Sequence, residues 1–148
     1  MNLHHFLLIL HLIAATIWVG GHIILCFIFL PKALKNKAPE IIIDFEKQYG
    51  PVGMPALFVL IFTGVWMAYD YGVPLQQWFA FSGGIETVVS TKLMLLFTTF
   101  AVAIHAQKAV IPKLSNQNLK EMSLHILAIT IIGIAMLVFG STIRFGGF

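Results

Sequence analysis

Four long runs of apolar residues, separated by short polar segments, dominate the pattern of the chain. They cover about residues 6–30, 52–68, 93–111 and 124–143. Each run reaches or approaches the roughly 20 residues with which a helix crosses the ~30 Å hydrocarbon layer of a bilayer. The runs do not alternate between apolar and polar positions, and a membrane barrel needs about eight strands or more. The pattern therefore predicts an all-α fold, in which residues 1–148 form one transmembrane domain of four helices.

Composition supports lipid as the surrounding medium. Hydrophobic residues make up 59% of the chain and charged residues 10%, against roughly 45–50% and about 25% in soluble domains. A soluble protein of this composition would expose large apolar patches and aggregate. The net charge of +3 is small and scattered, and no basic run is interleaved with aromatic residues. We therefore expect membrane lipid and no nucleic acid as a partner.

The first apolar run has to be distinguished from a cleaved signal peptide. It lacks a basic segment before the apolar stretch, the stretch is too long, and no small-residue cleavage site precedes Pro31. We expect it to be a retained helix. The single cysteine, Cys26, lies within it, so the chain has no internal disulfide and Cys26 is expected to be a small buried hydrophobic residue.

The distribution of basic residues predicts the orientation. Two of them, Lys92 and Arg144, lie at one side of the predicted helices, and the other seven lie in or beside the first and third connections. These seven are Lys32, Lys35, Lys37, Lys47, Lys108, Lys113 and Lys120. The positive-inside rule places both lysine-bearing connections in the cytoplasm and both termini outside. In a multi-pass protein of a bacterial inner membrane, that outer side is the periplasm.

A short segment after Pro39 repeats an apolar residue every four positions, at Ile41, Phe45 and Tyr49. This spacing puts the three side chains on one face of a helix. We expect the segment to lie along the cytoplasmic surface of the membrane.

Histidines supply the candidate chemistry. At least four of the six fall within or at the edge of the apolar runs, where an ionisable residue is costly and marks function, and no acidic residue occurs there. The absence of acidic residues argues against a carboxylate-based pump and favours neutral imidazole as a ligand. The six are His4, His5, His11, His22, His105 and His125.

Histidine spacing predicts two levels of ligands in the membrane. His11 and His22 are eleven residues apart, which places them on one helix face about 16 Å from each other. In the fourth run, Met136 follows His125 by the same interval. If the first and fourth helices are neighbours, the inner level combines His22 with His105 or His125.

At the outer level, His11 is expected to combine with Met136, His4 or His5. Two such levels are what a transmembrane pair of b-type haems requires, with axial His or with His and Met on the iron. Arg144 and Lys92 could pair with the propionates of an outer haem, and Lys108 or Lys32 with those of an inner one. The sequence thus predicts one or two haems and an electron-transfer role, with the redox partner unknown.

Two other interpretations stay open. The same histidines could bind or transport copper, with methionines as soft ligands. The candidate methionines are Met54, Met67, Met94 and Met136. Alternatively, the histidines could form hydrogen bonds between helices in a purely structural role. Met136 could then be an ordinary packing residue and Arg144 an anchor at the membrane surface.

Several segments resemble one known family. They are LHLIAATIWVGGHIIL followed by LPKAL, which contains His11 and His22, then HAQKAVIPKL with His105, HILAIT with His125 and IRFGG with Arg144. In this order they resemble the short stand-alone members of the copper-resistance D (CopD) family of bacterial inner-membrane proteins. The resemblance covers nearly the full length and implies a four-helix membrane protein named for copper handling.

The first helix and the general layout are more distantly similar to the haem-associated, four-helix protoporphyrinogen oxidases. The fourth helix departs from that pattern, so whether the chain is a haem-dependent oxidoreductase stays open. Four helices surround two macrocycles incompletely, which is compatible with a homodimer.

Overall fold

The helices are longer than the apolar runs. The computed structural model describes residues 2–147, so the two end residues of the predicted 1–148 domain lie outside the described residues. The α-helices are α1 (Leu3–Ile24), α2 (Leu30–Asn36), α3 (Glu40–Asp70), α4 (Gly84–His105) and α5 (Leu119–Thr142). Shorter π-helical or 3₁₀ segments cover Leu25–Phe29, Leu75–Gln77, Ala106–Val110, Ile111–Lys113 and Ile143–Phe145. No strand occurs among the described residues.

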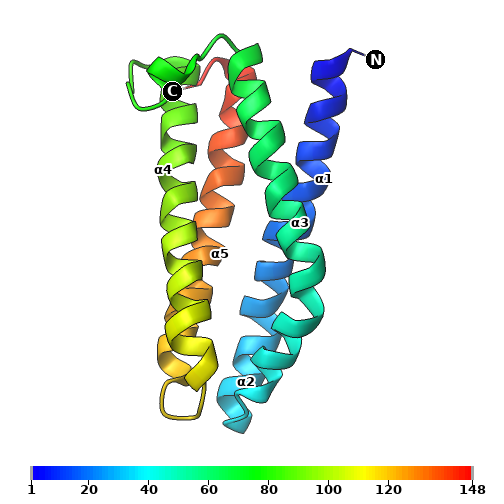
Figure 1. Cartoon of the computed structure of the whole chain (residues 1–148), viewed down its shortest axis with the longest axis vertical. Coiled ribbons are helices and arrows are strands. Elements are labelled where there is room, and N and C mark those ends of the chain that lie inside the picture. The colour runs from blue at the N-terminus through cyan, green and yellow to red at the C-terminus, as the bar shows by residue number, and fades with distance from the viewer. Residues whose placement is uncertain (1, 148) are drawn as a thin grey trace.

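Four continuous helical stretches are long and apolar enough to cross a membrane: Leu3–Asn36, Glu40–Asp70, Gly84–Lys113 and Leu119–Phe145. The prediction of an all-α chain with four such helices is confirmed. The stretches run antiparallel, so α1 begins where α5 ends (Figure 1). We call this the terminal end, which also holds the connection 71–83, and we call the opposite end, with the connections 37–39 and 114–118, the lysine end.

The start of α3 differs from the sequence-based expectation. Ile41, Phe45 and Tyr49 belong to the first turns of one continuous helix that runs from Glu40 to Asp70. They form no separate helix along the membrane surface. Ile41 and Phe45 pack against the buried core at the lysine end. The apolar run had suggested a later start because the first turns of α3 carry polar and charged residues, among them Asp44, Glu46 and Lys47.

The chain forms two helical hairpins, the first from α1, α2 and α3 and the second from α4 and α5. A π-helical turn precedes a proline in both of them. Leu25–Phe29 comes directly before the turn with Pro31, and Ala106–Val110 comes before Pro112. Proline has no N–H and its ring clashes with the carbonyl four residues earlier, so a wider turn relieves the clash. The two hairpins therefore share a feature at the lysine end, although their sequences show no convincing repeat.

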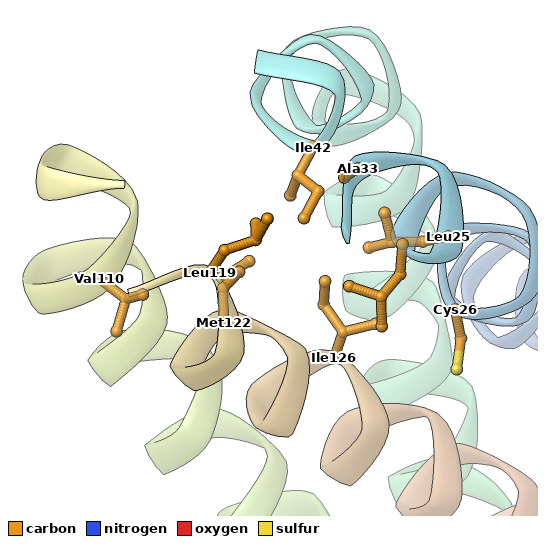
Figure 2. Close-up of a cluster of buried hydrophobic side chains, with 9 residues drawn as sticks. Leu25, Cys26, Ala33, Ile42, Val110, Leu119, Met122 and Ile126 are labelled. Carbon is orange, nitrogen blue, oxygen red and sulfur yellow. The ribbon is translucent and has the colours of Figure 1, made fainter. Parts of the chain in front are cut away.

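The core is densest at the lysine end. Buried apolar side chains from both hairpins meet there (Figure 2), namely Leu25, Cys26, Leu30, Ala33, Ile42, Val110, Leu119, Met122 and Ile126. The burial expected for Cys26 is confirmed. A second cluster lies further toward the terminal end and contains Ala14, Trp18, Val19, Ala56, Leu57 and Ile129. It joins α1, α3 and α5.

Helix neighbours follow a simple order. α1 packs most extensively on α3, α4 packs on α5, and α1 joins the two hairpins through α5. Direct contacts between α3 and α4 are few. Because these two helices do not close against each other, space remains between the hairpins toward the terminal end.

Candidate haem or metal cavity

A cavity of ≈ 440 Å³ occupies this space. Its walls come from α1, α3, α4 and α5 and from the 3₁₀ turn after α5. Most lining side chains are apolar, and three glycines, Gly64, Gly133 and Gly140, also contribute to the walls. The cavity is an apolar chamber with a small number of polar groups, which is the usual character of a ligand site.

The polar groups of the cavity include residues that the sequence had assigned to the outer level. His11, Lys92, Met136 and Arg144 come from three helices and a turn, and all four line the cavity. His4 and His5, the other outer candidates, do not line it. The structure therefore brings one histidine, one methionine and two cations to a common chamber. Their roles as ligands stay predictions.

The protonation of His11 follows from its partner on α3. Nδ1 of His11 lies 2.8 Å from Oγ1 of Thr63, whose own hydroxyl donates to the carbonyl oxygen of Val59 at 2.6 Å. Since that hydroxyl proton is used, Nδ1 of His11 must be the donor and Thr63 the acceptor. Nε2 of His11 then carries the lone pair and is the nitrogen available to a ligand.

Gly64 permits the close approach of α1 and α3 at this point. A Cβ atom on Gly64 would lie 3.3 Å from Cε1 of the His11 ring. Any larger residue would push the imidazole away from its position beside Thr63. Thr63 thus positions His11 through a hydrogen bond, and Gly64 leaves room for the ring because it has no side chain.

Two basic side chains, Lys92 and Arg144, line the cavity. Nζ of Lys92 lies beside Gly140, where a Cβ atom would be 3.3 Å away. Neither Lys92 nor Arg144 forms an ion pair with another of the described residues; the guanidinium of Arg144 lies over the Phe145 ring at 5.0 Å. Arg144 is exposed and Lys92 is partly buried. Burial of the Lys92 charge is costly unless an anionic group joins it or the amine is neutral.

His4 is engaged outside the cavity. Its Nδ1 lies 3.0 Å from Oδ2 of Asp70, and its ring meets the edge of Tyr71 at 5.1 Å between centroids. This contact ties the start of α1 to the end of α3. His5 is exposed.

His22 lies between aromatic rings on the α1–α3 face. Its Nδ1–H donates to the carbonyl oxygen of Trp18 at 2.8 Å, and its ring centroid lies 4.5 Å from Trp18 and 5.9 Å from Tyr49. The hydroxyl of Tyr49 donates to the same carbonyl at 2.9 Å. His22 does not line the cavity.

His105 and His125 pair with each other instead of with His22. Nδ1 of His105 lies 2.7 Å from Nε2 of His125. The inner level predicted from spacing is therefore divided into two places, His22 on the α1–α3 side and the two-histidine pair between α4 and α5. Within residues 2–147, no group of three or more His, Cys, Asp or Glu side chains is placed to hold a metal ion.

The four candidate methionines lie in different places in the structure. Met67 and Met136 line the cavity, whereas Met54 and Met94 are each 51% exposed. Only the first two can share a ligand with His11.

Sequence reasoning missed the contacts of Thr63 and Gly64 with His11 and the position of Tyr49. The available signal was a threonine followed by a glycine, Thr63 and Gly64, in the middle of an apolar run. Nothing in the run shows that this point lies opposite His11, since that depends on the register of α1 against α3.

Fold and site together define a four-helix chain with a largely apolar cavity that is lined by one histidine and two basic residues, neither of which has an ion-pair partner among residues 2–147. A comparison of the chain with models of protein families, with curated proteins and with solved structures finds no match.

Proposed function

We propose that the chain is a b-type haem-binding integral membrane protein with a redox role, and that it holds one haem in the cavity with His11 as an axial ligand. The observation that carries the proposal is that His11, whose Nδ1 is held by Thr63, lines a largely apolar cavity together with Lys92 and Arg144. Haem needs the same three elements: a nitrogen ligand, apolar walls and cations for its propionates.

The dimensions and the walls support this ligand. A volume of ≈ 440 Å³ falls within the roughly 300–1,000 Å³ of small-molecule sites. Most of the side chains that line the cavity are apolar, which suits the faces of a macrocycle. Met136 is the candidate for the second axial position, because it lines the same chamber.

When bound, the haem would supply one-electron chemistry. The chain's own residues have simpler tasks. Thr63 fixes the tautomer of His11, and such partners of a ligating histidine also raise its basicity. Apolar walls exclude water, and Lys92 and Arg144 neutralise the carboxylates. The redox partner and any reaction beyond electron transfer are not specified by these residues.

The proposal includes insertion into a bacterial inner membrane with the terminal end outside. Four helical stretches have the necessary length and apolar character. The lysine end carries most of the basic residues, as the cytoplasmic side of a membrane protein does. In this orientation the haem lies in the outer half of the membrane.

Copper binding is the second candidate, favoured by one observation. His11, Met67 and Met136 line the cavity together, and one imidazole with two thioethers is a ligand set that suits Cu⁺. The resemblance of the segments to the copper-resistance D family points in the same direction. The cations oppose it, because Lys92 and Arg144 would repel a metal ion that brings no carboxylates.

Absorbance and metal analysis of the purified protein separate the two candidates. In mild detergent, the haem form should show a Soret band that shifts on reduction with dithionite, at one haem per chain. His11→Ala should lose nearly all of this absorbance, while the matched variants His5→Ala and His22→Ala keep it. Loss of half the haem in His22→Ala would instead indicate two haems. A colourless protein with one copper per chain would establish the copper candidate, and one with neither would refute both.

A further inference from the structure

The pair formed by His105 and His125 lies apart from the cavity. His105 is the last residue of α4 and His125 lies in the second turn of α5, toward the lysine end. Their rings are nearly parallel, with 8° between the planes and 5.0 Å between the centroids. His105 is exposed, His125 is partly exposed, and neither lines the cavity. Placing two imidazoles on the outside of a membrane bundle costs free energy, so such residues are candidates for a functional site.

Hydrogen bonds fix the protonation of the pair. Nδ1–H of His125 donates to the carbonyl oxygen of Glu121 at 2.8 Å, so Nε2 of His125 carries a lone pair. That lone pair accepts a hydrogen bond from Nδ1–H of His105 at 2.7 Å. Two ring nitrogens from different helices therefore point at the same small space, and one proton holds them together.

We propose that this pair is a metal site in its own right, which binds a borderline transition-metal cation such as Zn²⁺ through Nδ1 of His105 and Nε2 of His125. Imidazole nitrogen is a preferred ligand of this class of cation. In the proposal the metal replaces the shared proton. That proton moves through water to Nε2 of His105, so the ring stays neutral and no net proton is released.

The two rings must move apart and turn so that both nitrogens face one metal ion. Zn–N bonds of about 2.0–2.1 Å in a tetrahedral site place two ligand nitrogens about 3.3 Å apart. The two nitrogens are now 2.7 Å apart in nearly coplanar rings, so the exposed His105 ring must swing outward and the His125 ring must tilt toward the metal. The bond from His125 to the Glu121 carbonyl is of the kind that orients metal-ligating histidines.

The surroundings predict an open and exchangeable site. No third His, Cys, Asp or Glu of the described residues completes the group, so water must fill the remaining positions. The exposure of His105 gives water that access. Lys108 follows His105 by one turn and Glu121 precedes His125 by one turn, so the nearest charges on the two helices offset each other. A bound ion would link α4 to α5.

The test is a Zn²⁺ titration of the full chain in detergent, purified without a polyhistidine tag and followed by calorimetry. Wild type should bind one Zn²⁺ per chain with micromolar affinity. His105→Gln and His125→Gln should each weaken binding at least tenfold. The double variant His4→Gln/His5→Gln, which removes histidines at the other end, should bind as wild type does.

Zinc binding and cavity occupancy are separate readouts. His11→Ala should leave the Zn²⁺ titration unchanged, and His105→Gln should leave the haem absorbance unchanged, which also shows that the variant is folded. The proposal therefore survives a failure of the haem assignment, and the reverse holds too. Absence of Zn²⁺ binding at 100 µM, or full binding by the His105→Gln/His125→Gln double variant, would overturn it.

Discussion

Thr63 is 1% exposed and sits on α3 between the carbonyl of Val59 and the ring of His11. Thr63→Val keeps the shape of the side chain and removes the hydroxyl, which leaves Nδ1 of His11 without its acceptor. Loss of such a partner costs about 10–100-fold in metal affinity, so we expect haem to dissociate that much more readily.

Thr63→Ser is the matched control, because it keeps the hydroxyl and removes only a methyl group. Transfer of haem to apomyoglobin measures the dissociation rate in wild type and both variants. Equal rates in Thr63→Val and wild type would show that the hydroxyl does not prepare His11 for a ligand.

Gly64 offers a second test at the scale of one residue. Gly64→Ala places a Cβ 3.3 Å from Cε1 of His11, so the ring must shift by a few tenths of an ångström. We expect lower haem occupancy than in wild type, measured as the ratio of Soret absorbance to protein. Gly50→Ala, on the same helix, meets nothing within 4 Å and should retain full occupancy. Similar occupancy in the two variants would remove Gly64 from the site.

Spacing along single helices predicted part of the candidate site. The eleven-residue intervals placed His11 and Met136 in the outer half, and their positions near the helix ends grouped Lys92 and Arg144 with them. All four line one cavity. Thr63 and Gly64 could not be found in this way, because a hydrogen bond between α1 and α3 depends on how the two helices are aligned.

At the scale of helices, Tyr49 is the main contact between α1 and α3 near the lysine end. Its hydroxyl donates to the carbonyls of Ile17 and Trp18, and its ring lies against Gly21 and Gly53. A Cβ atom on either glycine would overlap that ring. The two glycines therefore set the distance between the helices, as small residues do in membrane proteins.

Neighbouring glycines on α1 make this contact testable. Gly21→Ala must displace Tyr49 and should destabilise the protein by about 1–3 kcal/mol, as overpacking does. Gly20→Ala meets nothing within 4 Å and should be neutral or slightly stabilising. The midpoint of thermal unfolding in detergent, followed by circular dichroism, compares the two. A lower midpoint for Gly20→Ala than for Gly21→Ala would contradict this packing.

Helix boundaries and helix neighbours were harder to predict than helix number. The apolar runs located all four helices, but the second and third runs began only after Pro51 and Lys92, since the runs record hydrophobicity and not hydrogen bonding. α3 continues through Pro51 and α4 through Lys92. The partner of His22 could not be predicted either. α1 packs on α3 more than on α5, so Tyr49 of α3 lies beside His22, where a second histidine was expected.

At the scale of the whole molecule, the lysine end is packed and the cavity lies toward the terminal end, so the two ends of the bundle differ. Both hairpins meet in one buried cluster at the lysine end, whereas His11, Lys92 and Arg144 line a chamber nearer the terminal end. A ligand held there would exchange electrons with the outer side more readily than with the cytoplasm. This expectation follows from the proposed orientation, in which the terminal end faces outward.

Cysteine labelling of intact cells tests that orientation. Cys26, the single cysteine, is 7% exposed, so it contributes little background. Ser82→Cys lies in the exposed connection at the terminal end and Asn116→Cys in the exposed connection at the lysine end. A membrane-impermeant maleimide, with the outer membrane made permeable, should label Ser82→Cys directly and Asn116→Cys only after the inner membrane is disrupted. The positive-inside rule rests on the lysines alone, so the reverse pattern would place the cavity in the cytoplasmic half and move any electron exchange to that side.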